Sequence, residues 1–304
     1  MSIRSIIVAT VVMFWAIPAL ADEPFVFIGS HLNTQRIGDG YSVPGNPRAS
    51  AQRRLVDNPN NNPTPDSTAE VRGWADLAVG LGSYSAVTGS ERNLQSQEAS
   101  IFKADNGSSL DYPFSIQSDT LPAGTAVSVN MILKVKGSFT TTGTSRGLMF
   151  ANADLIPEID APHQLVYQSE VSFFGDTADA GGDLWIANQP TPDAVLARIK
   201  SSVTKHAITG GLAADVDWMD TFSFPAVVGE NYTFDMSLNT STWAEHASDV
   251  QVIAAFDDTA SASLVAADST CRIVAIVPEP AAMSMLLLGI SLPSFRRRAR
   301  IFRR

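Results

Sequence analysis

The sequence has few of the residues on which disulfide, zinc and histidine-based acid–base chemistry depend. It contains 304 residues but only one cysteine, Cys271, and four histidines. A single cysteine forms no internal disulfide, so we interpret Cys271 as a small buried side chain, with an intermolecular disulfide as the alternative. No two histidines stand at the spacing of a zinc site or of an H-E-x-x-H motif. A disulfide-stapled domain and a zinc hydrolase are therefore not expected.

Positive charge is also scarce, and much of it lies at the two ends. The chain has 21 basic and 31 acidic residues, a net charge of −10. Residues 1–21 and 278–304, interpreted below as processing signals, hold seven of the basic residues and one acidic residue. The remaining body has 14 basic against 30 acidic residues, a net charge of −16. Nucleic-acid binding needs a basic surface and is not expected of such a body.

The N-terminus has the layout of a secretory signal peptide. Arg4 opens a short basic region, residues 6–17 are almost wholly apolar, and Ala19 and Ala21 place small residues where signal peptidase cleaves. The apolar run is shorter than the ~20 residues of a membrane-spanning helix, which favours a cleaved signal over a retained anchor. We expect cleavage after Ala21 and export of the mature chain.

The C-terminus combines three elements in a fixed order. A rigid Pro-Glu-Pro motif is followed by an apolar run over residues 281–292 and then by an arginine cluster. As a helix the run spans roughly 18 Å, or roughly 22 Å if counted to Phe295, which is short of the ~30 Å hydrocarbon core. The arginines favour the cytoplasmic side. The pattern predicts a short apolar sorting helix that the membrane holds transiently.

These elements resemble the PEP-CTERM sorting signal of exported Gram-negative proteins. The resemblance implies cleavage by an exosortase-type membrane protease, transient anchoring in the inner membrane, and transfer to the cell surface or to an exopolysaccharide matrix. Residues 119–138 and 228–260 also look like segments common in such proteins, whose bodies are predicted to be β-sandwiches. The residues to which the resemblance assigns roles in processing are Pro278, Glu279, Pro280, Arg296, Arg297 and Arg298.

The body between the signals divides into two regions by composition. Residues 22–70 contain a short apolar stretch, residues 25–28, and a proline- and asparagine-rich passage, residues 43–66. The passage has too few apolar residues to fold alone. We therefore expect residues 22–70 to be a strand with a loop or linker, residues 71–277 to be the folded domain, and residues 278–304 to be the sorting signal.

From about Tyr112 onward the dominant hydrophobic period is two. Apolar and polar side chains alternate over residues 112–116, 127–135 and 232–238, with Asp235 on the polar side. Such alternation is typical of antiparallel sheets that bury one face. Many short strands separated by glycine turns predict an all-β fold, an antiparallel β-sandwich with a jelly-roll-like topology. The turn signals lie at residues 105–107, 122–124, 143–147, 181–182 and 229–231.

One short helix is expected after residue 190. Thr191 can cap it, Pro192 suits the first helical position, and apolar residues recur at helical spacing from Val195 to Val203. We expect the helix to pack across one edge of the sandwich. A lid or partner-binding element is the alternative.

Two acidic clusters are candidates for calcium binding, because Ca²⁺ prefers oxygen ligands. Neither has the spacing of an EF-hand loop, and solvated loop carboxylates are the ordinary explanation. No other cofactor is predicted. The clusters are Asp176, Asp179 and Asp183 on a glycine-bearing loop, and Asp215, Asp217 and Asp220 near Trp218.

Four tryptophans are candidates for stacking against sugar rings. Because tryptophan has a large apolar area, we expect at least two of them to lie in the core instead. The four are Trp74, Trp185, Trp218 and Trp243.

No arrangement of residues in the sequence specifies catalysis. Residues 143–147 match G-x-S-x-G, but threonines precede the motif where a hydrophobic strand is required, and a probable strand over residues 148–151 follows it in place of a helix. We therefore predict a non-enzymatic, exported surface or matrix protein with a structural or adhesive β-sandwich. A carbohydrate-binding module, with or without calcium, is the first alternative. A secreted hydrolase with paired carboxylates is the second.

Overall fold

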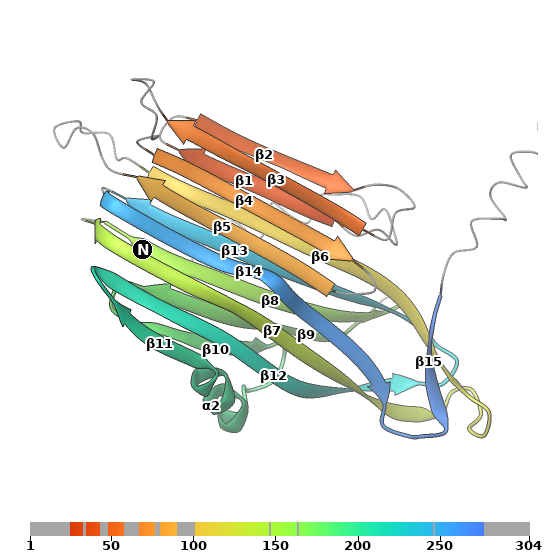
Figure 1. Cartoon of the computed structure of the whole chain (residues 1–304). Coiled ribbons are helices and arrows are strands. Elements are labelled where there is room, and N and C mark those ends of the chain that lie inside the picture. The colour runs from red at the N-terminus through yellow and green to blue at the C-terminus, as the bar shows by residue number, and fades with distance from the viewer. Residues whose placement is uncertain are drawn as a thin grey trace, which may run out of the picture.

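Strands dominate the computed structural model of the chain (Figure 1). It describes residues 25–32, 35–42, 48–57, 67–76, 80–89, 101–145, 147–162, 164–245 and 247–276. Both predicted processing signals, and with them every residue assigned to processing, lie outside the described residues. No helix within the described ranges has the length and apolar character needed to cross a membrane.

The first of two antiparallel sheets, sheet A, has the strand order β10-β9-β8-β13-β6-β1-β2. Strand β15 pairs with residues 114–118 of β6, beyond the point where the pairing with β1 ends. The bounds are β1 Phe25–Leu32, β2 Gln35–Ser42, β6 Ile101–Ser118, β8 Met149–Ala161, β9 Gln164–Asp176, β10 Ala180–Ile186, β13 Asn231–Glu245 and β15 Cys271–Ala275.

Sheet B has the order β11-β12-β7-β14-β5-β4-β3 and forms the second layer in Figure 1. Its bounds are β3 Arg48–Asp57, β4 Ser67–Asp76, β5 Gly80–Gly89, β7 Ala126–Ser145, β11 Val203–Ile208, β12 Gly211–Val227 and β14 Ala247–Ala266. The two sheets share one hydrophobic core. The predicted all-β, antiparallel fold is therefore confirmed, and the arrangement is that of a β-sandwich.

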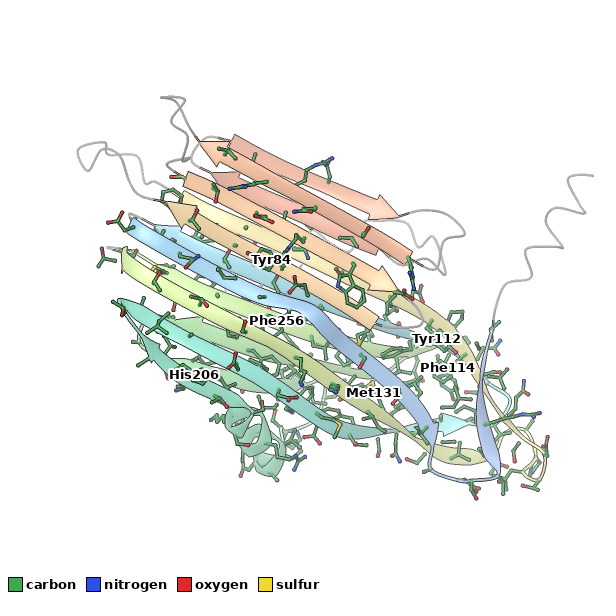
Figure 2. The ribbon with its side chains drawn as sticks, in the orientation of Figure 1. Tyr84, Tyr112, Phe114, Met131, His206 and Phe256 are labelled. Atoms are coloured by element: carbon green, nitrogen blue, oxygen red, sulfur yellow. The ribbon has the colours of Figure 1, made fainter. Side chains whose placement is uncertain are left out.

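Period-two alternation places the predicted side chains in this core. In β7 the side chains of Val129, Met131, Leu133 and Val135 are fully buried, and Lys134 between them is exposed. In β13 the residues from Tyr232 to Leu238 alternate in the same way. Figure 2 labels two of the fully buried residues, Phe114 and Met131.

The core is aromatic in one half and small or polar in the other. Near β7, β9, β12 and β14, the rings of Phe139 and Phe256 lie 5.0 Å apart and those of Phe173 and Trp218 lie 6.1 Å apart. Between β4, β5 and β6, the Asn106 amide donates hydrogen bonds to Ser83 Oγ at 2.6 Å and to the Arg72 carbonyl at 2.8 Å. The second half is thus joined partly by a buried polar network.

Several local expectations were wrong. Residues 48–57, within the passage expected to be a loop, form β3 because β4 supplies a ladder of backbone partners for them. The turn signals at residues 105–107 and 181–182 lie inside β6 and β10. The sheets begin at Phe25, and residue 71 lies within β4. The turns at residues 122–124 and 229–231 are confirmed, with positive φ angles at Gly124 and Gly229.

The expected helix is present as α2, Asp193–Ser201, at the end of the sandwich beside β10, β11 and β12 (Figure 1). Its N-cap is Pro192 and not Thr191, because the Thr191 hydroxyl donates to the Leu184 carbonyl at 2.8 Å. Ile199 is fully buried against Gly182, where an added Cβ would lie 2.4 Å from its Cγ2. The helix therefore packs at the sandwich edge, as expected.

Candidate functional site

The strands of sheet A send polar side chains to the face that points away from the core. In β8, Ala153, Leu155 and Ile159 are buried inward, so Asp154 and Glu158 point outward. Strands β6, β9 and β13 alternate in the same way. We call the surface made by the outward side chains of these four strands the outer face of sheet A.

Three carboxyl groups meet side by side on this face. Asp235 of β13 lies directly opposite Asp111 of β6 on one side and Glu158 of β8 on the other. Gln168 of β9 lies opposite Glu158 and donates a hydrogen bond from Nε2 to Glu158 Oε2 at 2.9 Å. We call Asp111, Asp235 and Glu158 the carboxyl ladder. Like charges in directly opposite positions destabilise a sheet.

Burial and neighbouring charges favour the protonated form of two members of the ladder. Partial burial, reinforced by the charges of Asp111, Glu158 and Asp160, raises the pKa of Asp235 to about 7. Burial also raises the pKa of Glu158 to about 7, with a further contribution from the charge of Asp160. A carboxyl group with such a pKa is protonated for part of the time near neutral pH and can then donate a hydrogen bond.

A second carboxyl pair lies farther along β8. Asn152 Nδ2 donates to Asp154 Oδ2 at 2.8 Å, and Asp154 lies opposite Ser172 of β9. Burial first, and then the charge of Glu170, raises the pKa of Asp154 to about 7. Burial raises the pKa of Glu170 as well. Carboxyl groups with raised pKa values therefore occur at two places on the same face.

An aromatic pair lies on the outer face near the end of β13. Trp243 lies directly opposite Phe150 of β8, and their rings are nearly parallel, with an interplanar angle of 5° and centroids 6.4 Å apart. On the other side Lys103 Nζ lies 4.9 Å from the centre of the Trp243 ring. The indole Nε1 donates to Glu245 Oε1 at 2.9 Å. These contacts hold the indole in place on a half-exposed surface.

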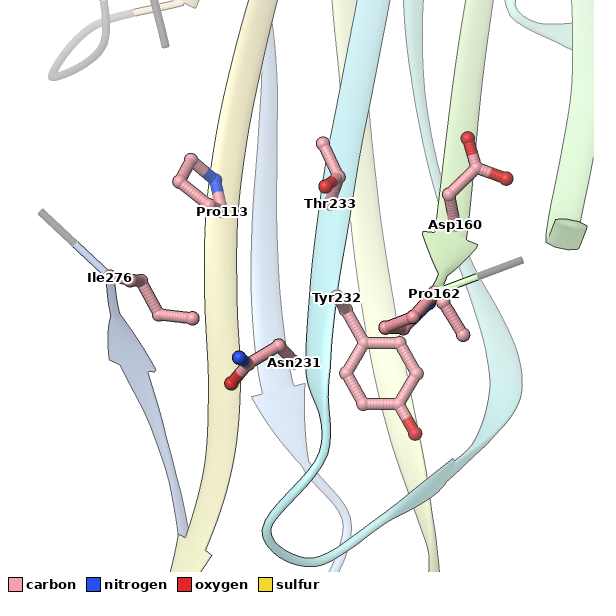
Figure 3. Close-up of a pocket in the computed structure, with 8 residues that line it drawn as sticks. Pro113, Asp160, Pro162, Asn231, Tyr232, Thr233 and Ile276 are labelled. Carbon is pink, nitrogen blue, oxygen red and sulfur yellow. The ribbon is translucent and has the colours of Figure 1, made fainter. Parts of the chain in front are cut away.

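A shallow depression of about 320 Å³ lies at the opposite end of the same face (Figure 3). Asp160, Thr233 and Pro113 continue the outward rows of β8, β13 and β6 into it. Depressions of this size are at the lower limit for small-molecule sites. Its lining is Pro113, Asp160, Ala161, Pro162, Asn231, Tyr232, Thr233 and Ile276.

The six calcium candidates do not converge on one point. Asp176 Oδ1 accepts two backbone N–H groups at 2.6 Å, so it closes the turn before β10. Asp215 and Asp217 are outward residues of a strand, β12, and not of a loop. Within the described ranges no group of three His, Cys, Asp or Glu side chains is arranged to hold a metal ion.

The remaining candidates have partners of their own. The side chains and backbone groups that engage them are Lys205 for Asp179, the Leu184 N–H for Asp183, His206 for Asp215, Lys136 for Asp217 and Arg198 for Asp220.

The four candidate tryptophans take three different environments. Trp218 is 2 % exposed and belongs to the core, whereas Trp185 is 53 % exposed. Trp74 and Trp243 are half-buried on the outer faces of sheets B and A. The expectation that at least two would be core residues was therefore wrong, because only Trp218 is fully enclosed.

Sequence reasoning missed the carboxyl ladder and the Asp154 pair. Their members lie far apart in the sequence and meet only through the register of neighbouring strands. Alternation along β13 did identify Asp235 as an outward residue. Comparisons with protein-family models, with curated proteins and with solved structures found no match.

Proposed function

We propose that this chain is an exported surface or matrix protein whose non-catalytic β-sandwich binds polysaccharide on the outer face of sheet A. The observation behind the proposal is the parallel pair Trp243 and Phe150 beside rows of hydrogen-bonding side chains. Aromatic rings pack against the apolar faces of sugars, and carboxyl and amide groups bind their hydroxyls.

The proposed topology is a jelly roll. Support comes from the order of eight adjacent strands, β5-β14-β7-β12 in sheet B and β6-β13-β8-β9 in sheet A. The chain crosses between the sheets at each step from β5 to β8 and again from β12 to β14, as in two interlocked Greek keys. In this scheme β10, α2 and β11 are an insertion, and β1 to β4 extend the two sheets.

The proposed destination is the cell surface or an exopolysaccharide matrix. Support comes from the sequence of the two ends: a signal peptide for signal peptidase, and a Pro-Glu-Pro motif, apolar run and arginine cluster for an exosortase-type protease. Before processing, the apolar run would hold the chain in the inner membrane. Mass spectrometry of the C-terminus in cells with and without the protease tests this. Retention of Arg304 in both would contradict it.

Polysaccharide binding is tested with the full-length chain and its variants on a glycan array and by affinity electrophoresis. We expect Trp243→Ala to weaken binding about ten-fold or more, because it removes the larger ring of the pair. The matched control is Met219→Ala, which removes a side chain 65 % exposed on the other sheet and should change nothing. Equal binding by all three proteins, or no binding by the wild type, would contradict the proposal.

A secreted hydrolase is the second candidate, and one observation favours it. The pKa of Asp154 is raised to about 7 beside Glu170, and glycosidases pair a protonated carboxyl with an ionised one. The test is an assay for new reducing ends on the polysaccharides that bind. Sugar release that Asp154→Asn abolishes would replace the non-catalytic proposal with this one.

A further inference from the structure

The outer face of sheet A combines sugar-binding features with acidic side chains that far outnumber the basic ones in its strands. Lys103 is the single basic residue in β6, β8, β9, β10 and β13. Lys103 already forms an ion pair with Asp105, with Nζ 2.7 Å from Oδ2, and a cation–π contact with the Trp243 ring. Asp154, Glu158 and Asp235 have no ion pair with a basic side chain in the described part of the chain. When ionised, Asp154, Glu158 and Asp235 therefore have no counter-charge among the described residues of this face.

This charge restricts the kind of polysaccharide that fits. Ionised carboxyl groups accept hydrogen bonds and do not donate them, so the ligand must supply donors. An acidic polysaccharide would be repelled, whereas an ammonium group supplies three donors and the missing positive charge. Charge complementarity thus distinguishes between polysaccharides that the aromatic pair alone would accept equally.

We propose that the outer face of sheet A binds a polysaccharide whose sugars bear free amino groups, with the rings packed on Trp243 and Phe150 and the ammonium groups set against the carboxyl rows. This inference rests on the proposed polysaccharide binding. Trp243 lies eight positions after Asp235 in β13, a distance of about 27 Å at ~3.4 Å per residue. An oligomer is therefore needed to reach both places, and a single sugar is not enough.

The experiment compares two ligands that differ only in charge. The full-length chain is titrated calorimetrically with glucosamine oligomers of about six units and with the fully N-acetylated oligomers of the same length, at pH 6 and matched ionic strength. We expect the amine form to bind about ten-fold more tightly. Because bound ammonium favours ionised carboxyls, protons should be released on binding, and the measured heat should depend on the ionisation enthalpy of the buffer.

Two variants separate the contributions. Asp235→Asn combined with Glu158→Gln should reduce the preference for the amine form to within about two-fold and leave binding of the N-acetylated form unchanged. Trp243→Ala should weaken both forms. Asp217→Asn, an exposed carboxylate on sheet B, is the matched control and should change neither.

The possible results distinguish the preference for amino sugars from polysaccharide binding itself. Equal binding of the two oligomers overturns the amine preference and leaves polysaccharide binding standing. Binding of neither oligomer, together with an empty glycan array, overturns both. A preference that survives in the Asp235→Asn, Glu158→Gln variant overturns the assignment to this face. Loss of the preference on adding millimolar Ca²⁺ at constant ionic strength would identify the carboxyls as a cation site instead.

Discussion

Charged residues that lie directly opposite each other are arranged differently on the outer faces of the two sheets. On sheet B, Lys136 lies directly opposite Asp217, with Nζ 3.2 Å from Oδ2. On sheet A, Asp235 lies directly opposite Asp111 and Glu158. Opposite charges in such positions contribute roughly 0.2–1 kcal/mol to stability, and like charges destabilise. The same cross-strand geometry thus stabilises one face and costs stability on the other.

This difference indicates where function lies. The pairing on sheet B needs no explanation beyond folding. The repulsion on sheet A lowers stability, and sites that lower stability are commonly those that serve binding or activity. The aromatic pair and the depression lined by Asp160 lie on the same face. Three independent features therefore single out the outer face of sheet A.

The largest expected effect that distinguishes the faces is in the pH dependence of stability. The pKa values of Asp154, Glu158 and Asp235 are raised to about 7 in the fold, against roughly 4 for the unfolded chain. Between these values the folded state binds more protons than the unfolded state, so stability falls as pH rises. After discounting the three shifts heavily for solvent screening and for their mutual coupling, we expect a loss of about 2 kcal/mol between pH 5 and pH 8, which lowers the melting temperature by about 4–8 °C.

Two variants check that the slope comes from sheet A. Asp235→Asn with Glu158→Gln should flatten the pH profile and melt above the wild type at pH 8, because neutral amides do not repel. Asp217→Asn should keep the wild-type slope. Melting is measured by circular dichroism. A wild-type melting temperature that rises between pH 5 and pH 8 would show that the carboxyl ladder does not lower stability.

A smaller effect is expected from an ion pair on the outer face of sheet B. Asp257 forms an ion pair with Arg72, in which Oδ2 lies 3.1 Å from Nη2. The Arg72 guanidinium also lies 3.9 Å from the centre of the Tyr84 ring. Both charged groups are partly exposed, so Asp257→Asn should cost about 0.5 kcal/mol by urea unfolding at pH 7. This change in the free energy of unfolding has the opposite sign to the change expected on sheet A, where removing a carboxylate should stabilise the fold. A gain in stability for Asp257→Asn would remove the distinction between the faces.

Much of the fold could be predicted because alternation in the sequence records burial directly. Residues 127–135 and 232–238 are buried on one side and polar on the other, and both form the expected strands. Strand β8 shows where such reasoning is weaker, because it contains Pro157, a residue that argues against a central strand. The strand continues to Ala161, and its pairing with β9 is interrupted at residues 156–157, where the proline has no N–H to donate.

The candidate site could be predicted only in part. Alternation placed Asp235 on the polar side of β13, but its neighbours depend on the register of β6 and β8 against it, and a slip of one residue would turn those carboxyls inward. The acidic clusters that sequence spacing favoured are instead tied to backbone N–H groups and nearby cations, as with Asp176 and Asp220. Proximity in sequence was thus a poor guide to proximity across a sheet.

The smallest effect is expected for the ion pair between Lys136 and Asp217 on the outer face of sheet B. The side chains of Lys136 and Asp217 are 49 % and 65 % exposed, so water screens their attraction and holding both in place costs side-chain entropy. Lys136→Gln should change the free energy of unfolding by less than about 0.5 kcal/mol in low salt and by nothing measurable in 1 M NaCl. A larger, salt-independent loss would mean that Lys136 stabilises through its packing, and the contrast between the faces would then rest on the carboxyl ladder alone.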